Sequence, residues 1–137
     1  MRWADQLIKL SNFELEMLQT RLAEVVGRRE AAQVKLAVLV AQGEAEIALA
    51  RTDPEMAWNV GAFTEALKLK KRAAQTDIDT VAAEEEGVRD AISEAFESLK
   101  KYEQVAENAR LADVRKEARI ETAAYDEMGL RGAVGRR

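Results

Sequence analysis

The sequence contains no cysteine and no histidine. Without cysteine there are no disulfides and no thiol chemistry, and without histidine the commonest general acid–base residue is missing. No apolar run approaches the roughly 20 residues that cross a bilayer, and the start, MRWADQLIKL, lacks the apolar core of a signal peptide. These absences predict a cytoplasmic protein that is not an enzyme, inserts into no membrane and holds no metal or other cofactor.

Aromatic residues are also scarce, at 5% of the 137 residues, whereas charged residues reach 34% and much of the hydrophobic 47% is alanine. A composition rich in Ala, Glu, Lys, Leu and Arg is typical of long helices and coiled coils. The net charge of −4 argues against nucleic acid as a partner, because binding phosphates requires a basic surface.

Proline occurs once, as Pro54, in the segment RTDPEMAWNVGAF. The sequences on both sides read as uninterrupted helices that are longer than those of ordinary globular proteins. We therefore predict an all-α fold, an antiparallel two-helix coiled-coil hairpin that forms one domain over residues 1–137. Its expected parts are a helix over 3–50, a hairpin loop over 51–61, a helix over 62–128 and a frayed tail over 129–137.

Residues at alternating steps of three and four along each helix form mainly apolar seams, as the a and d positions of a coiled coil do. In the first helix they are Ile8, Ser11, Leu15, Leu18, Leu22, Val25, Arg29, Ala32, Leu36, Leu39, Gly43, Ile47 and Ala50. In the second they are Phe63, Leu67, Lys71, Ala74, Ile78, Val81, Glu85, Val88, Ile92, Ala95, Leu99, Tyr102, Ala106 and Ala109.

Folding back at the loop places opposite each other the residues whose numbers add to 113 or 114, among them Arg29 and Glu85. A buried charge is costly unless it is paired, so we predict that these two residues pair and fix the register. The acidic stretch 76–98 then faces Arg21, Arg28, Arg29 and Lys35, and the basic run 68–72 faces Glu44 and Glu46. Consecutive helix positions point in different directions, so Glu84, Glu85 and Glu86 are read as a solvated face rather than a metal site.

The second helix outlasts its partner near residue 110, so the segment from about Leu111 to Met128 is expected to overhang. A fold-back of residues 110–128 into a three-helix arrangement is the alternative. Trp3, Leu7, Leu10 and Met17 form a second apolar stripe beside the seam. That stripe is either a docking face at the open end of the hairpin, or a surface covered by the overhang or by a second copy.

Three stretches of the sequence resemble the FliJ-type flagellar export proteins, which belong to the flagellar type III secretion apparatus. They are WADQLIKLSNFELEMLQTRLAEV at the start, TDP followed by an aromatic-containing loop, and AFESLKKYEQVAENAR at residues 95–110. The similarity covers nearly the whole chain. It implies a slender two-helix coiled coil similar to the stalk of rotary ATPases. It also implies three partners: the hexameric export ATPase, the export-gate membrane protein and the export chaperones.

Under this resemblance the expected function is that of a stalk-like coupling factor, recruited peripherally to the membrane at the flagellar base and monomeric when free. The rival hypothesis is a coiled-coil scaffold or chaperone that dimerises through the N-terminal stripe. The candidates for contact with the export gate are Met56, Trp58 and Val60 in the loop. The candidates for contact with the ATPase are Trp3, Leu7, Leu10, Met17, Leu111, Val114 and Ile120.

Overall fold

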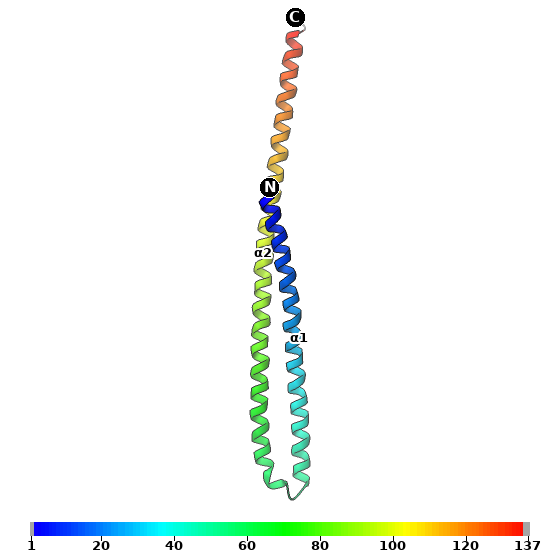
Figure 1. The fold of residues 1–137 in the computed structure, drawn as a ribbon, viewed down its shortest axis with the longest axis vertical. Coiled ribbons are helices and arrows are strands. Elements are labelled where there is room, and N and C mark those ends of the chain that lie inside the picture. The colour runs from blue at the N-terminus through cyan, green and yellow to red at the C-terminus, as the bar shows by residue number, and fades with distance from the viewer. Residues whose placement is uncertain (1, 136–137) are drawn as a thin grey trace. The chain divides into compact units, whose positions relative to one another are not determined.

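The computed structural model describes residues 2–135, and the side chains of residues 2–132. These residues form the helix α1 (Arg2–Thr52), the short 3-10 helix η1 (Ala57–Asn59) and the helix α2 (Val60–Gly135), as Figure 1 shows. No strand occurs in this part of the chain. The predicted fold class, an all-α helical hairpin, is therefore confirmed.

The chain divides into two compact units. Unit 1 comprises Met1–Leu15 and Glu94–Arg137, and unit 2 comprises Glu16–Ser93. In unit 2, α1 and α2 lie side by side and antiparallel, and the loop joins them at one end (Figure 1). In unit 1, the first turns of α1 lie beside α2, and α2 continues beyond them (Figure 1).

A thin apolar seam holds the helix pair together in each unit. Every seam position named above is buried or half-buried. The buried apolar side chains are small or aliphatic: Ala4, Leu15, Ala95 and Leu99 in unit 1, and Val25, Ala50, Leu67, Ile78 and Val81 in unit 2. Long helices in water gain most of their stability by packing an apolar face. The stability of each helix pair therefore depends on its seam, because the described side chains form no thicker core.

The loop is shorter than the sequence predicts, because the backbone turns tightly at Asp53. The carbonyl oxygen of Asp53 accepts hydrogen bonds from the N–H groups of Met56, at 3.0 Å, and of Ala57, at 2.9 Å. Its carboxylate Oδ1 also accepts one from the N–H of Glu55, at 3.0 Å, an arrangement typical of aspartate in turns. Before the turn, the Thr52 hydroxyl donates to the Leu49 carbonyl at 2.8 Å, and α1 runs through Thr52.

The helix ends also differ from the expected bounds. Val60 and Gly61, expected in the loop, are the first two residues of α2. At the other end α2 continues through Gly135, beyond the expected end at residue 128, and residues 136–137 lie outside the described part. Described glycines such as Gly129 and Gly132 do not adopt the positive φ that ends many helices.

Candidate partner-binding surfaces

A layer of charged residues crosses the seam of unit 2. Arg29 Nε donates to Glu85 Oε1 at 2.8 Å, and Arg28 Nη1 donates to Glu84 Oε2 at 2.7 Å. The Arg29 and Glu85 side chains are only 26% and 17% exposed, whereas those of Arg28 and Glu84 are 47% and 40% exposed. Arg89 Nε also lies 3.6 Å from Glu85 Oε2. Arg29 and Glu85, two charged residues at seam positions, thus lie together, and each satisfies the charge of the other.

The pKa values of this pair respond to the contact. The hydrogen bond from Arg29 lowers the pKa of Glu85, and the charges of Arg29 and Arg89 act in the same direction, while partial desolvation opposes them. The same hydrogen bond, with the charge of Glu85, raises the pKa of Arg29. Both residues are therefore held in their charged forms, which suits a structural ion pair and offers no general acid or base.

Among the described side chains, the other charge pairings expected across the seam do not form. Lys68, from the basic run, pairs with Glu65 on its own helix at 3.3 Å, and Arg21 pairs with Glu24 on its own helix at 3.2 Å. Residues three positions apart on a helix are natural neighbours, and that local option prevails here. No group of three or more His, Cys, Asp or Glu that could hold a metal occurs in the described residues. None of their helices is long and apolar enough to span a membrane.

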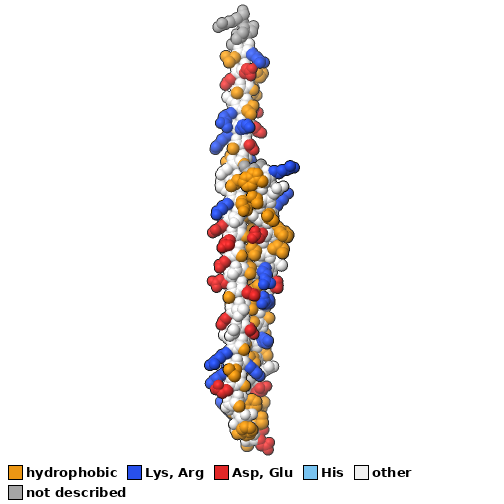
Figure 2. All heavy atoms as spheres, turned by 60° about the vertical axis from the view of Figure 1, so that its left-hand side comes forward, with side chains coloured by type: hydrophobic (Ala, Val, Ile, Leu, Met, Phe, Trp, Pro, Cys, Tyr) orange, Lys and Arg blue, Asp and Glu red, His pale blue; other side chains and the backbone are white. Residues whose placement is uncertain are grey.

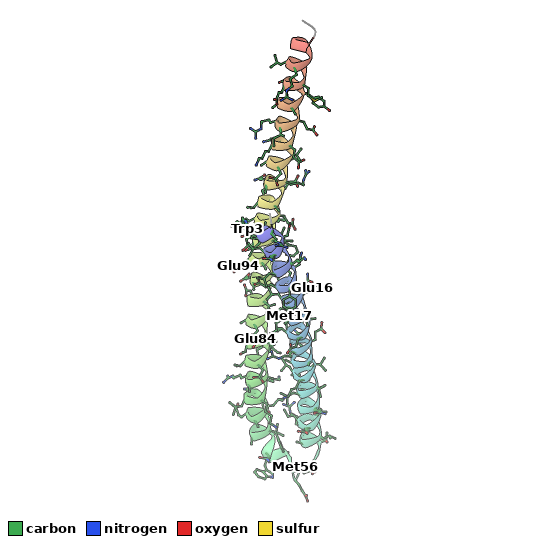
Figure 3. All side chains as sticks on the ribbon, turned by 45° about the horizontal axis from the view of Figure 1, so that its top comes forward. Trp3, Glu16, Met17, Met56, Glu84 and Glu94 are labelled. Atoms are coloured by element: carbon green, nitrogen blue, oxygen red, sulfur yellow. The ribbon has the colours of Figure 1, made fainter. Side chains whose placement is uncertain are left out.

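The N-terminal stripe of unit 1 is exposed to solvent. Trp3 is 53% exposed and Leu10 61%, and Phe13, on the next turn, is 59% exposed. Leu7 is half-buried beside the buried Ala4. Figure 2 shows hydrophobic side chains gathered on the first turns of α1, and Figure 3 labels Trp3 there. A single exposed apolar residue is normal, but several on neighbouring turns of one helix make this stripe a candidate interaction surface.

Met17, the remaining member of the predicted stripe, belongs to unit 2 and is 57% exposed. It follows Phe13 by four residues on the same helix, a spacing that keeps side chains on one face. Of the predicted stripe, Trp3, Leu7 and Leu10 thus belong to unit 1, whereas Met17 belongs to unit 2.

The overhanging part of α2 in unit 1 is fully exposed. Every described side chain from residue 111 to residue 132 is exposed, and α2 is unbroken over these residues. The alternative fold-back into a three-helix arrangement is therefore not present. Among the predicted contact residues, Leu111 is 37%, Val114 50% and Ile120 60% exposed. This stretch presents a bare helix with apolar side chains that nothing in the described residues covers.

The loop of unit 2 carries a further exposed aromatic residue. Trp58 is 81% exposed and Met56 41%, and Met56 lies at the loop end of the unit (Figure 3). Val60 is half-buried at the start of α2, so it is less available to a partner than the sequence suggests. Tryptophan is enriched among residues that dominate protein interfaces, and Trp58 is the best placed of the three.

The sequence interpretation missed several exposed apolar residues. Tyr125 and Met128, which are 71% and 66% exposed, extend the bare part of α2, and Val34 and Val38 stand out from α1 in unit 2 at 62% and 46%. The signal was available, because each valine stands two residues after a seam position, which turns it away from the partner helix.

The chain is similar to known proteins over nearly its whole length. No family model matches the chain, and no solved structure matches it. Flagellar FliJ proteins from two strains of Caulobacter vibrioides, NA1000 / CB15N and ATCC 19089 / CIP 103742 / CB 15, are each 44% identical to it over 137 residues. Each alignment covers 99% of this chain and 99% of the relative.

Proposed function

The chain belongs to the FliJ family of flagellar proteins, and from this premise we propose that it is a non-enzymatic coupling factor of flagellar type III protein export. It acts in the cytoplasm and is recruited peripherally to the membrane at the flagellar base. It binds the hexameric export ATPase through unit 1 and the export-gate membrane protein through the loop of unit 2, and it also meets the export chaperones.

One observation carries the ATPase contact. Unit 1 combines exposed apolar residues on the first turns of α1, such as Trp3 and Leu10, with a bare stretch of α2 that begins at Leu111. A protein that worked alone would gain stability by burying these side chains, at about 25 cal/mol per Å² of apolar area. Their exposure supports a surface kept for a partner, and a slender helical unit is suited to enter a protein ring.

The test mixes the protein with the export ATPase of the same organism and follows ring assembly by light scattering and ATP turnover by phosphate release. We expect the wild-type protein to promote both, and Leu10→Asp with Val114→Asp to abolish the effect. Both side chains are at least half exposed, so the substitutions leave the seam intact. Val34→Asp is the matched control, since Val34 is 62% exposed on α1 in unit 2.

The gate contact has its own experiment. Trp58→Ala is expected to weaken binding to the cytoplasmic part of the gate protein at least tenfold, as for a tryptophan that dominates an interface, and to leave ATPase stimulation unchanged. If the wild-type protein neither promotes assembly of the ATPase ring nor raises ATP turnover, the proposed coupling function is wrong. In that case the scaffold hypothesis would be the better account.

A further inference from the structure

A groove opens on unit 2 at the loop end, between the last turns of α1, the loop and the first turn of α2. Its volume is about 420 Å³, and it is lined by Glu46, Leu49, Ala50, Asp53, Met56 and Phe63. We call it the tip groove. Ala50 is buried and Phe63 half-buried, whereas Leu49 and Met56 are 71% and 41% exposed. A cavity of about 150 Å³ is enough to hold benzene, so the tip groove has room for a large apolar side chain.

Two carboxylates, those of Glu46 and Asp53, line the same groove. Neither forms an ion pair in the part of the chain that the structure describes. Figure 2 shows red acidic groups next to hydrophobic side chains at this end of unit 2. An apolar side chain that entered the groove beside a basic group would bury apolar area and also meet negative charge.

The chain itself carries such a combination on α2. Leu69 is 64% exposed, and it does not line the tip groove. Arg72 follows it by three residues, so the two side chains are neighbours on one face of the helix. Arg72 is exposed and has no ion-pair partner among the described residues. An exposed leucine beside an unpaired arginine complements an apolar groove beside two unpaired carboxylates.

We propose that the tip groove binds a second copy of this chain, with Leu69 of the second copy in the groove and its Arg72 near Glu46 and Asp53. A two-fold arrangement repeats the contact in both directions and closes a dimer, whereas a one-directional contact would continue into a filament. The contact is small, so the dimer is weak. It departs from the expectation of a free monomer, and it involves none of the residues of unit 1 that serve the proposed ATPase contact.

The first test is the oligomeric state, measured by sedimentation at protein concentrations up to several hundred micromolar. The wild-type protein is expected to dimerise, and Leu69→Asp and Met56→Asp are each expected to weaken the dimer at least tenfold, as for residues central to an interface. Val34→Asp and Leu10→Asp are matched controls on exposed residues elsewhere, and both are expected to dimerise as the wild type does. A wild-type protein that stays monomeric throughout overturns the proposal.

The controls also separate this dimer from the rival one. If Leu10→Asp abolishes dimerisation and Leu69→Asp does not, the N-terminal stripe is the self-association surface and the tip groove is not. The charges are tested by exchange: Glu46→Arg and Arg72→Glu are each expected to weaken the dimer severalfold, and the double variant is expected to recover affinity. If the affinity losses of the two single variants simply add in the double variant, Glu46 and Arg72 do not contact each other between the two copies.

Proximity has a direct readout because the chain contains no cysteine. With dissolved oxygen as the oxidant, a Leu69→Cys protein mixed with a Leu49→Cys protein is expected to form the mixed disulfide faster than either protein forms a disulfide with itself. The control pair is Leu69→Cys with Leu10→Cys, which is expected to show no such preference. Equal rates for the two pairs would mean that Leu69 does not reach the tip groove.

Discussion

Leu67 occupies the space beside Gly43 that any side chain at that position would need. A Cβ atom placed on Gly43 would lie 2.9 Å from Leu67 Cδ2 and 3.1 Å from its Cγ, and closer still to Cδ1. Leu67 is one of the buried residues of unit 2, at 9% exposure. The glycine therefore forms the hole into which this leucine packs. That role explains why a residue unfavourable in a helix interior stands in the middle of the seam.

Gly43→Ala is expected not to stabilise the protein, although alanine is favoured over glycine in a helix by about 1 kcal/mol. The methyl group overpacks the seam, at a cost of about 1–3 kcal/mol, so the net change lies between neutral and a loss of about 2 kcal/mol. Gly27→Ala is the control, because nothing lies within 4 Å of the corresponding position. It is expected to gain about 1 kcal/mol.

Urea unfolding of the two variants, followed by far-UV circular dichroism, measures this difference. The interpretation fails if Gly43→Ala is as stabilising as Gly27→Ala. In that case Leu67 can move aside without loss, and the glycine has no packing role.

The Arg29–Glu85 ion pair is expected to fix the register of unit 2. Reversing one charge, as in Arg29→Glu or Glu85→Arg, places like charges together in a half-buried layer and is expected to lower the melting temperature by several degrees. The exchanged double variant restores an opposite pair and is expected to recover most of the loss. If the two losses simply add, the residues do not interact, and the register is set by the apolar seam alone.

The seam itself was predictable because its evidence is local. Spacing of three and four residues identifies the buried face of a helix without any knowledge of its partner, and positions such as Leu22 and Val88 are half-buried as expected. The Arg29–Glu85 contact followed from the same spacing once the fold-back was assumed. Both depend on the regular geometry of helices, which the sequence encodes directly.

The loop bounds and the exposed surfaces were less predictable because they depend on competition between alternatives. Gly61 reads as a helix breaker, yet the turn at Asp53 closes with backbone hydrogen bonds before it, which leaves Gly61 free to be helical. Lys68 has an acidic residue both across the seam and on its own helix, and the nearer option, Glu65, prevails. The tip groove depends on how Leu49, Met56 and Phe63 meet in space, which spacing along the chain does not reveal.

Acid is expected to destabilise unit 2 partly through Glu85. The Arg29 hydrogen bond lowers the pKa of Glu85 in the folded protein, so the folded state favours the carboxylate. This contribution is fully present above the unfolded pKa of about 4.3, and it is lost as the pH falls through the lower folded value. The same contact raises the pKa of Arg29. The stability that this shift gives the folded protein is present in full at all pH values below the alkaline range.

Melting temperatures measured from neutral pH down to about pH 2 test this linkage. Glu85→Gln is expected to be less stable than the wild type at neutral pH and to approach it at the acid end. Glu107→Gln is a useful comparison, because a hydrogen bond from Arg110 on the same helix lowers the pKa of Glu107 without joining α1 to α2. A difference between Glu85→Gln and the wild type that stays constant over the whole range would contradict the assignment.

Removal of the residues after Arg110 is expected to leave the folded helix pair intact. Every described side chain from residue 111 to residue 132 is exposed, so the deletion removes no buried contact. The melting temperature is therefore expected to change by no more than a degree or two, as is usual for changes at the surface.

The same deletion removes Leu111, Val114 and Ile120, and it is expected to abolish stimulation of the export ATPase. A full-length Leu111→Asp, Val114→Asp variant controls for the loss of length. A melting temperature that falls by many degrees would show that this segment packs against the helix pair in solution, as the three-helix alternative requires. Unchanged stability with full ATPase stimulation would instead confine the docking surface to the first turns of α1.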